Sequence, residues 1–360
     1  MHLVDMLALR PVPAAAVFFS LTRRCPLSCA HCSTNSMLTS DEQPAEVFLR
    51  FADSFTSADH PEILMLTGGE ALLRVKLVQQ LIERAHAVGT KVCVISGMFF
   101  AREPTVPPLI RDVIATVDHF TASLDVFHEQ QVPRAQVFRV LHELVDRGQD
   151  VSLQVVGLDA HDPYLAEVID DIRQTFADRV PIMVAQVRAV GRAKTWLQQQ
   201  PAHLPHLPLD IDPAPCVLAA WPTVAFDGAV VACCNQAVVD GPHPEHLLLG
   251  HAAVDDWTTI RERCLSSHFV RAIRVFGPHY VAERYSAGNG CDGYCATCHK
   301  VANDPAVITQ LEPVISRATM PIVEQQVMLM QQERFSQGIL TYEHLRWLGY
   351  APEKRAVCVG

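Results

Sequence analysis

The sequence lacks any run of about 18 apolar residues, the length that a membrane-spanning helix requires. Its first nine residues contain Asp5 and no basic cluster, so no secretion signal is predicted and a cytoplasmic location is expected. Basic residues are outnumbered, because 29 Lys and Arg face 39 Asp and Glu for a net charge of −10. This balance argues against nucleic acid or an anionic membrane as the main partner.

Internal repeats and low-complexity segments are also lacking, whereas cysteine is abundant. The 360 residues include twelve cysteines, and 49% of the chain is hydrophobic, enough for one large domain and a smaller one. The cysteines gather near residue 30 and between residues 216 and 298. In a chain without a secretion signal, such clusters indicate metal or redox chemistry in a reducing compartment. Cys93, Cys264 and Cys358 stand apart from these patterns and are predicted to be structural.

Short apolar runs alternate with longer amphipathic segments between residues 15 and 190. The predicted strands span 16–21, 63–66, 92–96, 119–124, 151–156 and 182–187. The predicted helices span 43–55, 72–87, 107–116, 135–147 and 164–176. This alternation indicates an α/β fold with a parallel sheet and right-handed crossovers, and a half-open (β/α)6 barrel fits it.

Three cysteines follow the first predicted strand at the spacing C-x3-C-x2-C: Cys25, Cys29 and Cys32. Three thiols in one loop cannot all pair as disulfides with one another, and cysteine thiolates are the usual ligands of iron–sulfur clusters. Because a cubane has four irons, three ligands leave one iron open to a non-protein ligand. Zinc is the alternative, although zinc sites more often use paired C-x2-C units and four protein ligands.

A second motif, Thr67-Gly68-Gly69-Glu70, closes the second predicted strand. The glycines allow a ligand to approach the backbone closely, and Glu70 can accept a hydrogen bond from an ammonium group.

The cysteine triplet, with the aromatic His31 before its last member, and the Gly-Gly-Glu turn resemble the signature of the radical S-adenosylmethionine (SAM) superfamily. The resemblance implies an enzyme with a partial (β/α)6 barrel and a 4Fe–4S cluster on Cys25, Cys29 and Cys32. The open iron would be chelated by the amino and carboxylate groups of SAM, with Gly68, Gly69 and Glu70 at the amino group. Electron transfer would split SAM into methionine and a 5′-deoxyadenosyl radical, which abstracts hydrogen from an unactivated C–H bond.

The same resemblance assigns further SAM contacts at the ends of later strands. Ser123 and Arg134 would bind the carboxylate, since the planar fork of arginine suits it. Ser96 and Asp125 would lie near the ribose. Val156, with Gly157 and the segment 190–193, would line the adenine. Arg134 could instead serve only as the start of a helix. The triplet Phe127-His128-Glu129 could be an acid/base or metal site at the barrel mouth, or a solvated loop.

A second cysteine set surrounds a predicted hairpin at Asp227-Gly228. Cys216 and Cys233 flank this turn, and Cys295 and Cys298 can supply two more ligands, with Cys291 as a substitute for either. The arrangement resembles the SPASM/twitch extension of some radical SAM enzymes, which carries auxiliary 4Fe–4S clusters. The C-x2-C-x5-C-x3-C run of a full SPASM domain is absent, so one auxiliary cluster is predicted. A structural zinc on the same thiols is the alternative.

Three regions are therefore predicted: a radical SAM barrel over 14–200, a small cluster domain over 211–302 and a helical segment over 303–360. The Pro- and His-rich stretch 200–215 is interpreted as a linker. Residues 256–274 are expected to be helical, 288–298 to be a loop, and 304–348 to be mostly helical.

The substrate is the least determined part of this interpretation. A peptide in natural-product biosynthesis is favoured narrowly over a small molecule such as an aminoglycoside-type sugar. A non-catalytic iron–sulfur or zinc protein is the alternative from another class. Expected partners are an electron donor such as flavodoxin or ferredoxin and a separate peptide-recognition protein, since Cys25 lies too near the start for a recognition domain to precede it.

Two reaction outcomes remain open. In an oxidation, the auxiliary cluster would accept the second electron. In an epimerisation, a cysteine would return hydrogen, with Cys234 as the first candidate and Cys291 as the second. If Cys233 and Cys234 continue the hairpin strand, their side chains point to opposite sides.

Overall fold

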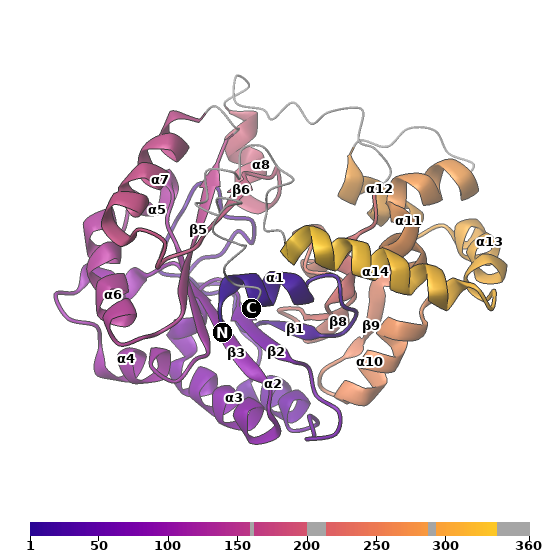
Figure 1. The fold of residues 1–360 in the computed structure, drawn as a ribbon, viewed down its shortest axis with the longest axis horizontal. Coiled ribbons are helices and arrows are strands. Elements are labelled where there is room, and N and C mark those ends of the chain that lie inside the picture. Colours follow the sequence, from indigo (N-terminus) through magenta and orange to yellow (C-terminus); the bar gives the residue numbers. More distant parts are fainter. Residues whose placement is uncertain (159–161, 200–213, 287–292, 337–360) are drawn as a thin grey trace.

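The computed structural model describes residues 1–158, 162–199, 214–286 and 293–336. Its centre is one open sheet of nine strands in the order β6-β5-β4-β3-β2-β1-β7-β8-β9 (Figure 1). The first six strands are β1 Ala16–Ser20, β2 Ile63–Thr67, β3 Lys91–Ser96, β4 His119–Ser123, β5 Val151–Gly157 and β6 Ile182–Gln186. They are all parallel and confirm the predicted strands, with ends that differ by no more than one residue.

The predicted hairpin extends this sheet. Its strands are β7 Thr223–Val224 and β8 Ala229–Val231, and β9 Leu248–His251 follows them. β7 pairs in parallel with β1, while β8 and β9 add antiparallel strands. The sheet is therefore mixed and does not close into a barrel, because β6 and β9 form its two outer edges among the described residues.

Helices cover the convex face of the parallel sheet. They are α2 Ala45–Ala52, η1 Ala71–Arg74, α3 Val75–Val88, η2 Phe99–Arg102, α4 Pro108–Ile114, α6 Arg134–Asp146 and α7 Pro163–Phe176, and α8 Gly191–Gln198 follows β6. Alternate strand residues such as Phe19, Leu64 and Phe120 are fully buried against this layer. The amphipathic segments of the sequence predicted α2, α3, α4, α6 and α7, since each buries one apolar stripe on the sheet, whereas η2 and α8 were not predicted.

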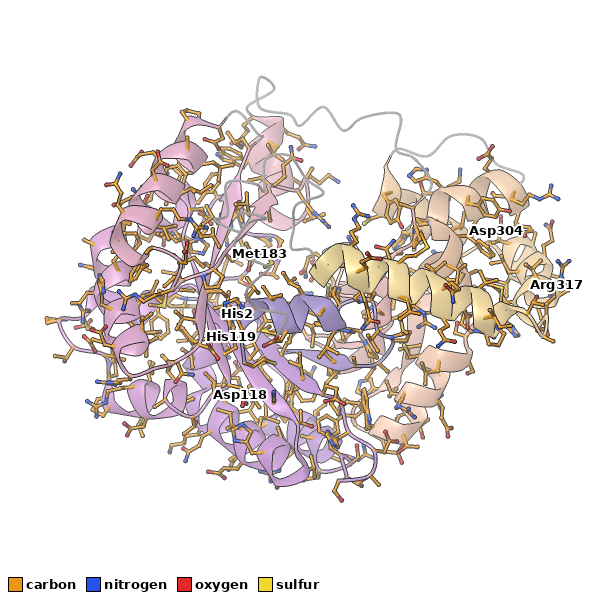
Figure 2. All side chains as sticks on the ribbon, in the orientation of Figure 1. His2, Asp118, His119, Met183, Asp304 and Arg317 are labelled. Atoms are coloured by element: carbon orange, nitrogen blue, oxygen red, sulfur yellow. The ribbon has the colours of Figure 1, made fainter. Side chains whose placement is uncertain are left out.

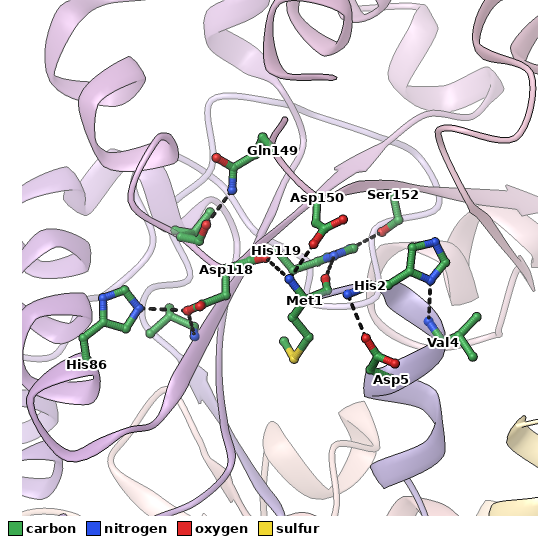
Figure 3. Close-up of polar contacts among 12 residues, drawn as sticks. Met1, His2, Val4, Asp5, His86, Asp118, His119, Gln149, Asp150 and Ser152 are labelled. Atoms are coloured by element: carbon green, nitrogen blue, oxygen red, sulfur yellow. Dashed lines mark hydrogen bonds and ion pairs between the residues drawn. The ribbon is translucent and has the colours of Figure 1, made fainter. Parts of the chain in front are cut away.

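A short helix that the sequence patterns did not predict, α1 Leu3–Leu9, lies on the opposite, concave face. Its Met6 packs with Ile63, Met65 and Cys93, the strand residues that point away from the outer helices. At one end of α1 the buried His119 bonds to the Met1 carbonyl through Nδ1 and to Ser152 Oγ through Nε2 (Figure 3). Burial lowers the pKa of His119 to about 4, so the ring is neutral.

These contacts lie at the amino ends of β4 and β5. The α-amino group of Met1 also donates to the Asp118 carbonyl at 2.9 Å and contacts the Asp150 carboxylate. Because α1 covers the amino ends of these strands on the concave face, a ligand would bind at their carboxyl ends.

The C-terminal part is helical, as predicted, but its boundaries differ. Its elements are α10 Trp257–Ser266, α11 His268–Tyr285, α12 Tyr294–Val301, α13 Pro305–Ile315 and α14 Met320–Ser336. Figure 2 labels Asp304 and Arg317, at the two ends of α13, in this region and far from His2 on the α1 side. α14 returns to α1, where Gln332 Nε2 donates to the Ala8 carbonyl.

Two sequence-based predictions for this part were wrong in detail. Residues 256–274 are not one helix, because Ser267 interrupts it and accepts a hydrogen bond from the Val270 amide as the cap of α11. Residues 294–298 are not loop, because α12 begins at Tyr294. Most of the predicted linker and the end of the predicted helical segment lie outside the described residues.

The remaining short elements are α5 Val126–Glu129, η4 Val217–Ala220, α9 Gln236–Val239 and η5 Glu245–Leu247. No helix in the described part of the chain is both long enough and apolar enough to cross a membrane.

Candidate active site

The Gly-Gly-Glu turn holds the start of the cysteine loop. Gly69 N donates to the Thr22 carbonyl at 2.6 Å, and Glu70 N donates to the Arg24 carbonyl at 2.9 Å. A Cβ atom on Gly68 or Gly69 would lie only 2.5 Å from one of these two carbonyl oxygens. The glycines therefore allow the backbone of the cysteine loop to approach the turn closely. The sequence analysis expected a ligand to make this close approach.

The three thiols of the loop each have a neighbouring hydrogen-bonding group. The Leu27 amide donates to Cys25 Sγ at 3.4 Å, Gln131 Nε2 donates to Cys29 Sγ at 3.5 Å, and the Thr34 hydroxyl lies 3.3 Å from Cys32 Sγ. Burial raises the pKa of Cys25 to about 12, and the charges of Glu70, Cys29 and Cys32 act in the same direction. The Cys25 thiol therefore ionises readily only beside a cation, and hydrogen bonds to sulfur are typical of iron–sulfur sites.

Helix α8 closes over the other side of this loop. Arg192 Nη1 donates to the Cys29 carbonyl at 2.9 Å, its Nη2 donates to the Ser36 carbonyl, and its amide donates to the Cys32 carbonyl at 2.9 Å. A Cβ atom on Gly191 would collide with the Ser33 carbonyl. The segment predicted to line the adenine thus contacts the cysteine loop.

Glu70 is buried, and both of its carboxylate oxygens accept hydrogen bonds. Its Oε1 accepts from the Leu72 amide at 3.0 Å, its Oε2 accepts from the Gly97 amide at 2.9 Å, and the Ser96 hydroxyl lies 3.1 Å from each oxygen. Burial raises the pKa of Glu70 to about 7, although these hydrogen bonds oppose the rise. Ser96, predicted near the ribose, is therefore a buried partner of Glu70.

Asp125 is enclosed completely at the end of β4. Its Oδ1 accepts from the amides of Phe127 and His128 at 3.0 Å each, which begins α5. Its Oδ2 lies 2.8 Å from His128 Nδ1 and 3.4 Å from His31 Nε2. The segment 127–129 is thus a helical turn with a buried Phe127, and the solvated-loop interpretation was wrong.

His31 and His128 differ electrostatically although their rings are 5.1 Å apart. Burial lowers the pKa of His31 to about 4, and its ring stacks on Phe127. Burial also disfavours the charged form of His128, but the adjacent Asp125 carboxylate wins and raises its pKa to about 10. One ligand atom each of Cys29, His31 and His128 lies within 4.8 Å of the others.

The remaining predicted SAM contacts lie at the same edge of the sheet. Ser123 and Val156 are half-buried at the carboxyl ends of β4 and β5. Arg134, the first residue of α6, is engaged by three carboxylates: Glu129 at 2.8 Å, Asp171 at 2.9 Å and Glu167 at 3.0 Å. To hold a SAM carboxylate, Arg134 would have to exchange one of these partners.

The second cysteine set converges from three segments. Cys216 precedes η4, Cys233 follows β8, and Cys295 and Cys298 lie on the first turns of α12. Burial raises the pKa of Cys298 well above its usual value, and the charges of Cys216, Cys233 and Cys295 add to the rise. The four thiols, two of them buried and two half-buried, are therefore close enough for their charges to interact. Among the described residues, no three of these sulfurs lie within 4.8 Å of one another. Four thiols are a donor set that suits a 4Fe–4S cluster or zinc. Cys291 lies outside the described residues.

Cys234 contacts an arginine that the sequence patterns did not single out. Arg10 Nη2 donates to Cys234 Sγ at 3.4 Å, and the Arg10 guanidinium lies 4.4 Å from the ring centre of Trp221. The argument from strand alternation was wrong here, because β8 ends at Val231 and both cysteines lie beyond it.

The sequence analysis did not predict the contacts that Arg10, Gln131 and Arg192 make with the cysteine segments. They join positions 102 to 224 residues apart, and a single sequence carries no signal of such pairs.

Comparison with known proteins agrees with this geometry. Residues 19–172 match the family model described as the radical SAM superfamily. The chain carries a radical SAM domain. Members of this superfamily are enzymes, and the matched range contains the cysteine triplet, Glu70 and Asp125.

Individual proteins that are similar to this chain share little sequence identity with it. The "Putative peptide biosynthesis protein YydG" of Bacillus subtilis (strain 168) is 26% identical over 231 residues, which are 62% of this chain and 70% of that protein. Streptococcus suis SuiB bound to S-adenosylmethionine has a TM-score of 0.44 at 12% identity and aligns over 62% of this chain and 61% of its own.

A third relative, native anSMEcpe with bound AdoMet and Cp18Cys peptide, has a TM-score of 0.49 at 10% identity. That alignment covers 88% of this chain and 99% of the anSMEcpe chain. Both TM-scores lie below 0.5.

Proposed function

We propose that this radical SAM protein cleaves SAM and abstracts hydrogen from an unactivated C–H bond of a peptide in natural-product biosynthesis. The observation that carries the proposal is the loop of the cysteine triplet, whose first residues Thr22 and Arg24 accept backbone hydrogen bonds from the Gly-Gly-Glu turn. The peptide substrate is supported by the similarity to YydG, which is described as a putative peptide biosynthesis protein. A small natural-product precursor, such as an aminoglycoside-type sugar, is the alternative substrate.

The residues present suit the group that the family implies. Cys25, Cys29 and Cys32 would hold a 4Fe–4S cluster, and Glu70 would accept a hydrogen bond from the SAM amino group. When bound and reduced, the cluster supplies the electron that splits SAM into methionine and the hydrogen-abstracting radical. Ser96 and the Gly97 amide fix both Glu70 oxygens, so the acceptor is oriented before SAM arrives.

The protein also has to shield a radical from water. Helix α8 and the Arg192 contacts cover one side of the cysteine loop, and α1 fills the amino end of the concave face. Ser123, Asp125 and Val156 remain candidates for SAM contacts at the open end. Arg134 remains a candidate for the SAM carboxylate if Glu129 or Asp171 releases it.

For the second thiol set, we propose one auxiliary 4Fe–4S cluster on Cys216, Cys233, Cys295 and Cys298. The support is the convergence of four thiols, two buried and two half-buried, whose charges act on one another. Zinc on the same thiols is the second candidate, since four protein ligands also suit a structural zinc. An auxiliary cluster would give an oxidation its electron acceptor, whereas zinc would favour a reaction without net oxidation. A cytoplasmic location and an electron donor such as flavodoxin or ferredoxin complete the proposal.

The experiment is SAM cleavage by the reconstituted, dithionite-reduced protein in the absence of substrate. We expect 5′-deoxyadenosine, measured by chromatography, because the triplet leaves one iron open for SAM. The matched control is Cys264→Ala, which removes a fully buried thiol on α10 outside both sets and should retain cleavage. Cys29→Ala should abolish it. Wild-type protein that contains a reduced cluster and forms no 5′-deoxyadenosine would refute the proposal.

A further inference from the structure

Arg10 is a buried cation that pairs with no carboxylate in the described part of the chain. It ends α1, and its guanidinium lies 4.4 Å from the ring centre of Trp221 and 5.6 Å from that of Phe18. Its Nη2 donates to Cys234 Sγ at 3.4 Å, and its Nη1 is buried without a hydrogen-bond partner. Arginine stays charged in proteins, and a buried charge without a partner is costly. The structure thus holds a positive charge that an anion would complete.

The segments that carry Cys216 and Cys233 both approach Arg10. Cys234, which accepts the guanidinium hydrogen bond, is the next residue after Cys233. Pro11, the residue after Arg10, lines a cavity of about 110 Å³ together with Cys216. Arg10 therefore lies beside two members of the second thiol set, although it is 224 residues from Cys234 in the sequence.

We infer that Arg10 is the counter-charge of the auxiliary cluster and raises its reduction potential. A 4Fe–4S cluster with four thiolate ligands is an anion, and reduction adds one more negative charge. A fixed cation nearby therefore stabilises the reduced form more than the oxidised form. The inference rests on the auxiliary cluster that we propose for the second thiol set. A raised potential suits the electron acceptor that the proposed oxidation requires.

A second arginine near this thiol set, Arg188, differs from Arg10 in its exposure. Burial raises the pKa of Cys295, and the charge of Arg188 opposes the rise, so this arginine also acts on the set. Arg188 is exposed, whereas Arg10 is buried against two aromatic rings. Water and salt screen an exposed charge more strongly than a buried one. Arg10→Met should therefore change the potential more than Arg188→Met, and the reverse order would contradict the inference.

The test is an EPR-monitored redox titration of the reconstituted full-length chain. In the parent protein for this titration, Cys25, Cys29 and Cys32 are replaced by alanine, so that the signal comes from the second thiol set. Arg10→Met should shift the midpoint potential to a more negative value, because the positive charge is lost. Arg10→Gln, a second neutral variant that keeps an N–H donor, should shift it in the same direction. Arg10→Lys, which keeps the charge, should stay close to the parent potential.

The matched control is Arg263→Met, because Arg263 is paired with Asp255 at 3.0 Å and donates to the Leu249 carbonyl. It should leave the potential unchanged, and equal iron and sulfide content shows that the cluster assembles in each variant. If the neutral Arg10 variants keep the parent potential, or if Arg10→Lys shifts it as far as they do, the counter-charge is refuted. If the parent binds zinc or no iron on the second set, the proposed auxiliary cluster fails, and the inference fails with it.

Discussion

Cys234 is the first candidate for the hydrogen donor of an epimerisation, and its sulfur contacts an arginine. Arg10 is 8% exposed, lies between Phe18 and Trp221, and donates to Cys234 Sγ. Because this guanidinium contact occupies the Cys234 sulfur, we favour an oxidation over an epimerisation in which Cys234 returns hydrogen.

The residue-scale prediction follows from this contact. In deuterium oxide, we expect a peptide product two hydrogens lighter than the substrate, with no solvent deuterium on the reacted carbon, because the thiol does not return hydrogen. Mass spectrometry of the product measures both quantities. Deuterium that enters the product with wild-type enzyme, but not with Cys234→Ala, would instead establish epimerisation. Cys264→Ala is the matched control, since Cys264 is a buried thiol that also lies beside an arginine, Arg274.

At the scale of elements, α8 fixes the loop that carries the first thiol set. Arg192 provides two guanidinium hydrogen bonds to loop carbonyls, and the loss of such a bond leaves a half-buried acceptor at a cost of about 1–3 kcal/mol. Arg192→Leu should therefore reduce the iron bound by the first set and lower SAM cleavage several-fold.

The control for this prediction lies on the same helix. Lys194 is exposed, so Lys194→Leu should keep the wild-type iron content and rate. Colorimetric iron and sulfide assays on the two variants, prepared in parallel, give the comparison. Equal iron content and equal SAM cleavage in both variants would show that α8 does not hold the loop.

The elements also show why the sequence predicted the strands of the barrel but not the helix that carries Cys295 and Cys298. β1 to β5 are largely buried runs rich in apolar residues, and β6 is an apolar run that is mostly half-buried, so local pattern was sufficient to predict them. α12 begins directly after Gly293. The glycines in this part of the sequence indicated a loop, so the helix was not predicted. On a helix, Cys295 and Cys298 are one turn apart and share a face, so the ligand prediction survives the change of element.

The contacts within the first site were harder to predict than its ligands. The spacing of Cys25, Cys29 and Cys32 and the Gly-Gly-Glu turn are local signals. Glu70 with Ser96, and Asp125 with His128, depend on strand ends and side-chain rotamers that no local pattern defines. α1 was missed because seven residues are too few for a periodic signal, and its stability comes from packing on the concave face.

For the whole molecule, both thiol sets belong to one continuous sheet. The first follows β1, and Cys233 follows β8, two strands away in the same sheet, through the parallel pairing of β7 with β1. The sequence predicted the hairpin but not that it would extend the barrel sheet, because the pairing joins strands about 200 residues apart. This arrangement gives the two proposed clusters a shared rigid support.

We propose that this chain carries two separate iron–sulfur clusters. The iron and sulfide content of the protein tests this proposal most directly. Reconstituted wild-type protein should bind about eight iron and about eight sulfide, by the four-iron stoichiometry of each cluster. Replacement of Cys25, Cys29 and Cys32 by alanine should leave about four iron on the second set, by the same stoichiometry. Stoichiometric zinc without sulfide in the wild-type protein would contradict the account.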